Sequence, residues 1–190
     1  MTYEIRPAGV ADVPALMALR TEAEGWLPSL GTDQWSDPET GSRAIDKWHA
    51  TIEDGRAWVI LDNRGSTVGT VSRGPADRDF WRDEDRPETA FYLYKLITAR
   101  SVGGTGLGSL VLDWACRVAA TEGREWLRID CWRTNTGLQR YYERLGFEHV
   151  RTEAPAHRRS GWLAQRSTSL ITNPNSVLLP HVSGRIRHNT

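Results

Sequence analysis

The residues best suited to chemistry form a glycine-rich turn, Gly103-Gly-Thr-Gly-Leu-Gly108. Its four glycines cannot serve helix stability, because each costs up to ~1 kcal/mol relative to alanine in a helix. Glycine instead leaves the backbone free and its N–H groups open to a ligand. After the turn, apolar residues recur at the spacing of an amphipathic helix: Leu107, Leu110, Val111, Trp114, Ala115 and Val118. A turn that opens a helix offers unpaired N–H groups and the positive end of the helix dipole, so the pattern predicts an anion site suited to phosphate.

The turn alone leaves a second interpretation open, a flexible connection that binds nothing. The neighbouring residues exclude two known phosphate motifs. No Lys-Ser/Thr pair follows the last glycine, so the turn is not a Walker loop. The dinucleotide fingerprint is Gly-x-Gly-x-x-Gly, and a match on Gly104 and Gly106 would need a third glycine at position 109. The chain has Ser109 there, so this motif is excluded as well. The choice between a phosphate site and a plain loop therefore depends on the elements around the turn.

The turn connects a predicted strand at residues 91–98 to a predicted helix that Gly123 ends. Before that strand, the patterns predict a strand at 2–7, a helix from Val13 to Leu27 with Asp12 as N-cap, a loop at 25–41, a helix at 42–53, a hairpin at 57–71 and a charged, solvated excursion at 75–87. After the helix, they predict a strand at 126–130, a helix capped by Thr134 or Asn135, strands at 147–152 and 163–171, and a tail beyond Thr172. The order β-α-α-β-β-β-α-β-α-β-β indicates a single mixed α/β domain.

The composition is typical of one soluble domain. The 190 residues can bury a real core, and 24 basic residues balance 24 acidic ones, so nothing argues for nucleic acid or a membrane as a partner. Cys116 and Cys131 are too few for a disulfide framework, which favours reduced thiols and a cytoplasmic location. The basic residues are almost all arginine, with lysine only at Lys47 and Lys95. We expect no transmembrane segment, no signal peptide and no metal.

Two separate stretches together resemble one family, the GNAT superfamily of acyl-CoA-dependent N-acetyltransferases. Its pyrophosphate signature, Gln/Arg-x-x-Gly-x-Gly/Ala, falls on Gly103-Gly-Thr-Gly-Leu-Gly108. Its second signature, an Asn followed seven residues later by Tyr and then by Gly-Phe, falls on Asn135, Tyr142 and Gly146-Phe147. The resemblance covers roughly residues 2–170, with 171–190 as a C-terminal tail. It implies a bacterial enzyme with a mixed, mostly antiparallel sheet that helices flank and whose central strands splay apart.

The resemblance also implies acetyl-CoA as cosubstrate. The residues expected to bind it are Ile97, Thr98, Gly103, Gly104, Thr105, Gly106, Leu107, Gly108, Ser109, Asn135 and Tyr142. Backbone N–H groups of the turn would hold the pyrophosphate. Ile97 and Thr98 would pair with the pantetheine amides, and Asn135 would bond the pantetheine arm while capping its helix. Tyr142 is the expected catalytic residue, a general acid for the departing thiolate; the alternative for it is a structural core aromatic.

Two positions depart from the family pattern. Gly103 stands where the signature has Gln or Arg, which removes a side chain but keeps the backbone donors. Tyr92 stands where protein-lysine acetyltransferases of the histone type carry a glutamate base, so the base is not identified. A water chain polarised by Tyr92, Tyr94 or a backbone carbonyl is the expected substitute. The more distant carboxylates considered are Glu22, Glu24, Asp33 and Asp130.

The acceptor is expected to be a primary amine of a small molecule that attacks the thioester directly in a ternary complex. In the family, the connection after the first helix lies over the acceptor end of the cleft. The residues assigned to the acceptor are Trp26, Asp33, Trp35, Tyr92 and Asp130. For the two tryptophans, packing on the core beneath a long loop is the alternative.

Other interpretations stay open. The reaction could pass through an acyl-enzyme on Cys131. The domain could bind acyl-CoA without catalysis and regulate a partner, or it could acetylate protein N-termini or lysines. The residues also leave open whether two copies form a homodimer.

Overall fold

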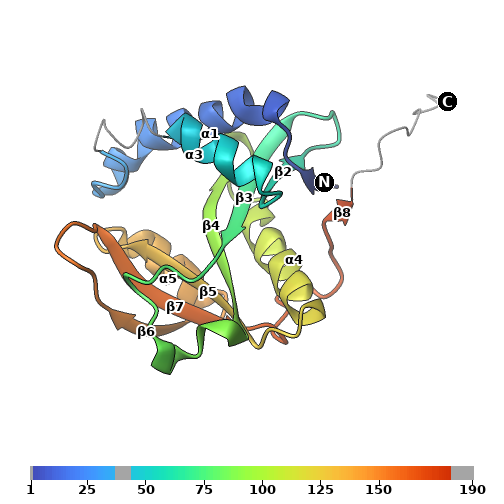
Figure 1. Ribbon diagram of the computed structural model, residues 1–190. Coiled ribbons are helices and arrows are strands. Elements are labelled where there is room, and N and C mark those ends of the chain that lie inside the picture. The colour runs from blue at the N-terminus through green and yellow to red at the C-terminus, as the bar shows by residue number, and fades with distance from the viewer. Residues whose placement is uncertain (1, 37–43, 181–190) are drawn as a thin grey trace.

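The chain folds around one eight-stranded mixed sheet, and helices pack on it (Figure 1). The computed structural model describes residues 2–36 and 44–180. The strands lie in the order β6-β7-β5-β4-β3-β2-β1-β8. Neighbouring strands are antiparallel, except that β4 runs parallel to β5 and β1 runs parallel to β8. The sheet is therefore mostly antiparallel, as the sequence predicts.

The strands are β1 (Glu4–Pro7), β2 (Ala57–Leu61), β3 (Thr67–Gly74), β4 (Ala90–Thr98), β5 (Trp126–Trp132), β6 (Glu148–Thr152), β7 (Ser160–Ser167) and β8 (Leu179–Pro180). The α-helices are α1 (Val13–Trp26), α3 (Ala44–Glu53), α4 (Leu107–Thr121) and α5 (Thr136–Arg144). The order from β1 to β7 confirms the predicted mixed α/β domain, and β8 is an addition. Among the described residues, no helix has both the length and the apolar composition needed to cross a membrane.

Alternation along β2 separates two apolar layers, because successive side chains of a strand point to opposite faces. Val59 and Leu61 pack with Leu16 of α1 and Trp48 of α3. Ile60, between them, belongs to the cluster that contains α4. The helices α1 and α3 therefore cover one face of this half of the sheet, and α4 covers the other.

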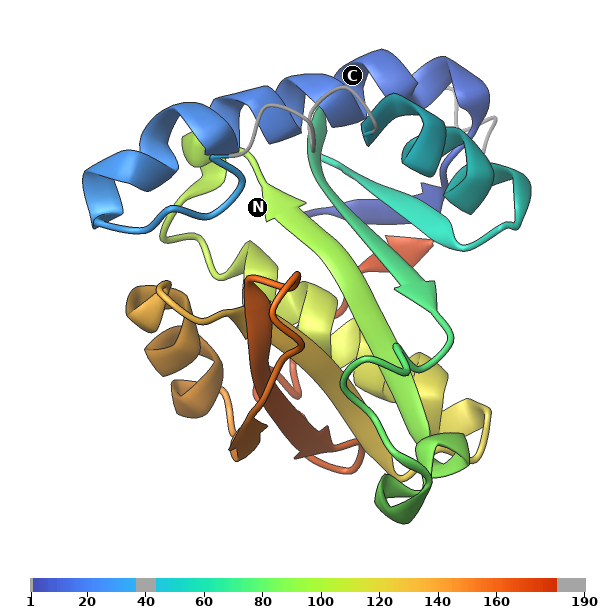
Figure 2. The same cartoon turned by 60° about the vertical axis from the view of Figure 1, so that its left-hand side comes forward.

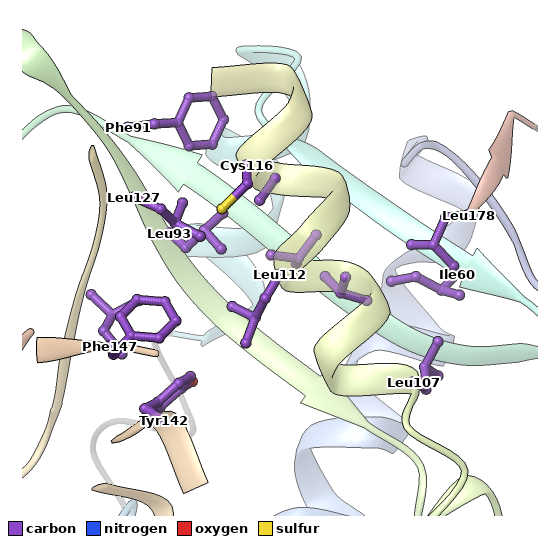
Figure 3. Close-up of a cluster of buried hydrophobic side chains, with 14 of the residues drawn as sticks. Ile60, Phe91, Leu93, Leu107, Leu112, Cys116, Leu127, Tyr142, Phe147 and Leu178 are labelled. Atoms are coloured by element: carbon purple, nitrogen blue, oxygen red, sulfur yellow. The ribbon is translucent and has the colours of Figure 1, made fainter. Parts of the chain in front are cut away.

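The layer that contains α4 joins the two halves of the sheet (Figure 3). Leu112 and Cys116 of α4 are fully buried there against Leu93 of β4 and Leu127 of β5. Tyr142 of α5 extends the same cluster. One apolar core thus holds α4 and α5 in fixed positions relative to the two central strands.

The central strands β4 and β5 pair only through residues 90–92 and 126–128. Beyond this short ladder they diverge, which Figure 2 shows as β4 and β5 lying together at one end and separating toward the other. The splay that the family resemblance implies is therefore present. The parting occurs at the carboxyl ends of two parallel strands, where ligand sites of such sheets usually lie.

A β-bulge interrupts β4 beside the parting. Tyr94 pairs with Ser72 and Ile97 pairs with Thr70, so two residues of β4 lie opposite one residue of β3. Within the bulge, Lys95 has a φ of 51°, a left-handed conformation that costs energy in a residue with a side chain. The bulge bends the strand and takes part of its backbone out of the ladder.

Residues 75–87 are not the solvated excursion that their charges predict. Phe80 and Trp81 are buried and pack with Leu163 of β7 in a separate apolar cluster. The guanidinium carbons of Arg128 and Arg158 lie 4.7 Å from the Trp81 ring centre and 4.3 Å from that of Phe80, respectively. The prediction weighed the charges and overlooked the two aromatic side chains that anchor the segment to the sheet.

The predicted loop at 25–41 begins later than expected. Helix α1 continues through Trp26 and is followed by a 3-10 turn, Leu27–Leu30. Gly25 and Trp26 are therefore helical residues, and the chain leaves the α-helix only as Pro28 and Gly31 follow. Residues 37–43 of the predicted loop lie outside the described residues. The predicted strand at 163–171 is likewise displaced, because β7 spans Ser160–Ser167.

Residues 172–180, which we call the C-terminal strap, pack against the domain although the sequence predicts a tail beyond Thr172. The β8 strand pairs with β1, and Leu178 is buried in the core. The Asn173 side-chain amide donates to Ser109 Oγ at 3.0 Å and to an Asp113 carboxylate oxygen at 2.9 Å, both on α4. The polar composition hid these contacts, because they depend on side-chain hydrogen bonds rather than on periodicity. Residues 181–190 lie outside the described residues.

Candidate active site

A cavity of about 380 Å³ lies where β4 and β5 part. Residues 93–97 of β4 and 129–132 of β5 line it, and Leu138 and Tyr142 of α5 contribute as well. We call it the inter-strand cavity. Because the ladder between the two strands ends at Tyr92, backbone groups that face the cavity are available to an extended ligand.

Tyr142 lines the inter-strand cavity, and Figure 3 shows its ring beside Phe147 in the apolar core. Its side chain is 8% exposed, and its ring packs edge-on against those of Tyr141 and Phe147, with centres 5.7 and 5.3 Å away. Burial raises the pKa of Tyr142, with smaller contributions from Cys131 and other neighbours. The hydroxyl therefore keeps its proton at neutral pH and can act as a proton donor.

Asp130 is the carboxylate that lines the inter-strand cavity among the described residues. Burial raises its pKa, and the hydrogen bond with Ser160 opposes that shift in part. The other carboxylates considered from the sequence are occupied elsewhere. Glu22 accepts the backbone N–H of Arg100 at 2.9 Å, and Glu24 forms an ion pair with Arg20 at 2.6 Å.

Asp33 and Tyr92, both assigned to the acceptor from the sequence, are absent from the described lining of the inter-strand cavity. Asp33 accepts the Trp132 indole N–H at 2.7 Å and lies 3.0 Å from an Arg159 nitrogen. Its pKa is lowered, chiefly by the hydrogen bond from Thr134. This carboxylate ties the segment after α1 to the end of β5.

Tyr92 lies in the apolar cluster of Phe80 and Trp81 rather than at the cavity. Its hydroxyl accepts a hydrogen bond from Arg128 at 3.0 Å. Tyr94 does line the cavity, but its hydroxyl donates to the Pro75 carbonyl at 2.7 Å. Neither tyrosine hydroxyl is therefore held in a way that presents it to a cavity water.

Cys131 also lines the inter-strand cavity and is buried. Cys116 and Cys131 are both free thiols. Burial raises the pKa of Cys131 to about 12, so almost none of it is thiolate at neutral pH. A nucleophilic cysteine needs the opposite shift, which disfavours the acyl-enzyme alternative.

The glycine turn leads into α4 as the sequence predicts, with φ of 76° at Gly104 and 80° at Gly106. Two of its N–H groups are already engaged: Gly103 donates to the Arg100 carbonyl at 2.9 Å and Thr105 to that of Val102 at 3.2 Å. These two residues were predicted to hold phosphate through their backbone donors. The unpaired donors are those of Gly104 and Gly106 and those at the start of α4, residues 107–109, since a helix cannot satisfy its own first N–H groups. A Cβ added at Gly104 would meet nothing within 4 Å, so the turn is open to an anion.

A second cavity of about 290 Å³ lies beside the first, and we call it the α1–α5 cavity. Ile97 and Thr98 of β4, Trp26 of α1 and Asn135 before α5 line it. The Asn135 side chain caps α5 by accepting the Leu138 N–H at 3.0 Å. The cavity thus brings together predicted pantetheine contacts with Trp26, which was assigned to the acceptor. Gln34, Trp35, Leu96, Ile97 and Leu138 line both cavities.

Sequence reasoning missed two residues of this region. Lys95 lines the inter-strand cavity from the β4 bulge. The sequence signal for it was the rarity of lysine, since the one other lysine of the chain, Lys47, lines the same cavity. The other is Tyr141, whose hydroxyl lies 2.4 Å from where a Cβ of Gly108 would stand. No local pattern of the sequence indicates this contact between Tyr141 and α4.

Comparisons with known proteins agree with this geometry. Residues 17–147 match the model of the acetyltransferase (GNAT) family. An uncharacterized N-acetyltransferase of Bacillus subtilis (strain 168), YesJ, is 30% identical over 154 residues, which cover 80% of this chain and 84% of the relative. A GNAT-family acetyltransferase from Listeria monocytogenes has a similar fold, with a TM-score of 0.65, 22% identity and coverage of 87% of this chain and 94% of the other.

A further solved structure is PaiA N-acetyltransferase from Thermoplasma acidophilum in complex with coenzyme A. It has a TM-score of 0.64, 15% identity and coverage of 88% of this chain and 99% of that one. At such identities the structures report on the fold, whereas the family model and the Bacillus relative report on ancestry. The chain belongs to the GNAT family of acetyltransferases.

Proposed function

We propose that the protein transfers the acetyl group of acetyl-CoA to the primary amine of a small molecule, by direct attack in a ternary complex. The observation that carries this proposal is the inter-strand cavity. There β4 and β5 part after a ladder of three residue pairs, and a protonated phenol, Tyr142, and a half-buried carboxylate, Asp130, line the same space.

The start of α4 has the features that a pyrophosphate needs. Unpaired N–H groups at residues 107–109 meet the positive end of the helix dipole. Gly104 leaves space beside its backbone and has a φ that only glycine adopts easily. An extended pantetheine arm would then run past Ile97 and Thr98 as an added strand, with Asn135 beside it. The structure of PaiA in complex with coenzyme A supports this donor by analogy.

The side chains of the cavity divide the proton transfers. Asp130, with its raised pKa, accepts the proton that the acceptor amine loses. Backbone N–H groups at the bulge around Lys95 stabilise negative charge that develops on the carbonyl oxygen. Tyr142 then donates its proton to the departing thiolate. The attacking amine and the thioester are held in one cavity, which supplies most of the orientation that the reaction requires.

The test is a panel of amines with acetyl-CoA, followed by release of free thiol, in the wild type and in Tyr142→Phe. We expect turnover with at least one amine and a fall in kcat of about 100-fold in Tyr142→Phe, with an unchanged Kd for acetyl-CoA. Tyr94→Phe serves as control, because Tyr94 lines the same cavity but its hydroxyl donates to the Pro75 carbonyl. Acetyl-CoA binding without thiol release across the panel would favour the regulatory alternative over catalysis.

Donor recognition has its own test. Acetyl-CoA should raise the Tm, and S-acetylpantetheine, which lacks the phosphates, should raise it much less. Equal shifts would remove the phosphate role from the start of α4. The variant Gly106→Val places a branched side chain at a residue with φ of 80°, so a folded variant should bind acetyl-CoA more weakly.

A further inference from the structure

The charge of the inter-strand cavity is predominantly positive. Among the described residues, four cationic side chains line it, Arg20, Lys47, Lys95 and Arg158, against one carboxylate, Asp130. The chain as a whole carries equal numbers of basic and acidic residues. The excess is therefore local to the cavity and does not reflect the composition.

Two of these cations have carboxylate partners. Arg20 pairs with Glu24 at 2.6 Å, and Arg158 pairs with Asp77 and Asp79 at 2.7 and 2.6 Å. Lys47 and Lys95 are different, because no carboxylate of the described residues lies within ion-pair distance of either ammonium. Lys47 is exposed and Lys95 is half-buried, so the unbalanced charge that is shielded from water lies at Lys95.

Lys95 is held in place with one donor to spare. Its ammonium lies 4.4 Å from the centre of the buried Trp48 ring and donates to the Lys47 carbonyl at 3.1 Å and to Thr51 Oγ1 at 3.0 Å. A lysine ammonium has three N–H donors, so one remains for a ligand. The bulge gives its backbone a left-handed φ, and strained residues of this kind cluster at functional sites.

The face of Trp35 that would attract a cationic acceptor is already in use. The Arg20 guanidinium carbon lies 5.2 Å from the centre of the Trp35 ring, which is the distance of a cation–π contact. A second cation on that ring would also meet the repulsion of Arg20. The charges on this side of the cavity therefore disfavour recognition of the acceptor by its positive charge.

We propose that the acceptor carries an anionic group, a carboxylate or a phosphate, near its amine, and that Lys95 binds this group. The inference rests on the proposed function and adds the acceptor class to it. The anion supplies the negatively charged partner that Lys95 lacks. Asp130, in the same cavity, contacts the end of the acceptor that carries the amine. An amino acid or an aminoalkyl phosphate carries both an amine and an anionic group, whereas a polyamine carries a second positive charge in place of the anion.

Titration of Lys95 provides a signature of this role. Burial lowers its pKa to about 8, with further lowering by Lys47, Arg20 and Arg56. The titratable groups across the cavity are Asp130, Cys131, Tyr142 and Arg158. A bound anion favours charged Lys95 and raises that pKa. Affinity for the anion is therefore complete below pH 8 and declines as the pH rises through the higher pKa of the bound state.

The experiment compares matched acceptors at one concentration of acetyl-CoA. An amino acid is paired with its amide, an aminoalkyl phosphate with the amino alcohol, and spermidine represents the cations. We expect kcat/KM to be about tenfold or more higher for the anionic member of at least one pair, the scale of one charge-assisted hydrogen bond. The pair that shows the preference distinguishes carboxylate from phosphate.

Variants separate binding from chemistry. Lys95→Gln should raise KM for the anionic acceptor about tenfold, leave kcat within about twofold and barely affect the neutral partner. Lys95→Arg should retain much of the affinity above pH 8, since arginine stays charged. Lys47→Gln changes an exposed residue of the same cavity and should give a smaller rise in KM, and Arg64→Gln, on the β2–β3 turn, is the distant control.

The failure of this inference differs from failure of the proposed function. Equal or better turnover of amides, amino alcohols or spermidine would overturn the anionic acceptor while leaving the acetyltransferase reaction in place. A loss of kcat in Lys95→Gln for charged and neutral acceptors alike would also overturn it, because it would give Lys95 a role in chemistry. The absence of thiol release with every amine of the panel would instead contradict the proposed function.

Discussion

Tyr142 and Asp130 line the same cavity, and burial raises the pKa of both side chains, with opposite chemical results. A phenol with a raised pKa stays protonated and can donate. A carboxylate with a raised pKa holds a proton more strongly, so it is a better base once ionised. One physical cause, removal from water, thus prepares a donor and an acceptor of protons.

This assignment predicts an acidic limb in the pH profile. Asp130 must be ionised to accept a proton, so kcat/KM should fall as the pH decreases through its raised pKa, which lies above the ordinary value of 3.8. Asp130→Asn should lose about 100-fold in kcat and should lose this limb. The measurement is kcat/KM against pH for one acceptor, in the wild type and the variant.

Protonation of the acceptor amine produces a limb of the same sign, so a control is needed. Acceptors that differ in amine pKa shift the amine limb by that difference, whereas the limb of Asp130 belongs to the enzyme and stays in place. If every limb moves with the acceptor and Asp130→Asn keeps wild-type turnover, Asp130 is not the base.

At the scale of elements, one contact between α4 and α5 sets the position of the coenzyme-binding turn. Gly108 lies in the first turn of α4, and a Cβ there would stand 2.4 Å from the Tyr141 hydroxyl and 3.4 Å from the ring carbon that bears it. A side chain at position 108 would therefore have to displace the Tyr141 ring, which couples this glycine to α5 independently of the phosphate.

Gly108→Ala is therefore expected to destabilise the protein by about 1–3 kcal/mol, the range for overpacking, and to weaken acetyl-CoA binding. Adding Tyr141→Phe removes the oxygen and leaves an ordinary 3.4 Å contact, so the double variant should recover most of the stability. Thermal unfolding of the two single variants and the double variant measures this coupling.

Gly25→Ala is the matched control for that cycle. Gly25 lies near the end of α1, and a Cβ there would meet nothing within 4 Å. The substitution should stabilise the protein slightly, because alanine is the better helix former. Additive effects of Gly108→Ala and Tyr141→Phe would contradict the packing role of Gly108.

The elements that the sequence predicts well are those with a local signal. The hairpin at 57–71 and the helix after the glycine turn follow from their residue types, and Asn135 is one of the two caps expected for α5. The bulge at Lys95 has no such signal, since it is an irregularity of the pairing between β3 and β4, just beyond the point where β4 separates from β5. Burial of Phe80 and Trp81 was missed for a similar reason: their contact with Leu163 spans half of the chain.

At the scale of the whole molecule, the C-terminal strap secures the domain to its first strand and to α4. Leu178 is 6% exposed and belongs to the main core, whereas its neighbour Val177 is 50% exposed. Leu178→Ala should cost about 2–5 kcal/mol of unfolding free energy, and Val177→Ala should change it by less than about 0.5 kcal/mol. Denaturant unfolding measures both, and equal effects would show that the strap adds nothing to the core.

The short ladder between β4 and β5 has a mechanical consequence. Three residue pairs form the backbone ladder between a five-strand part of the sheet and a three-strand part, and the apolar α4 layer also connects the two parts. This connection deforms more easily than the longer ladders in the rest of the sheet. A ligand that forms hydrogen bonds with the unpaired edges of both β4 and β5 adds backbone pairing between the two parts and stiffens the connection. We therefore expect acetyl-CoA to make the two parts unfold as one cooperative unit and to slow amide hydrogen exchange on both sides of the connection at once.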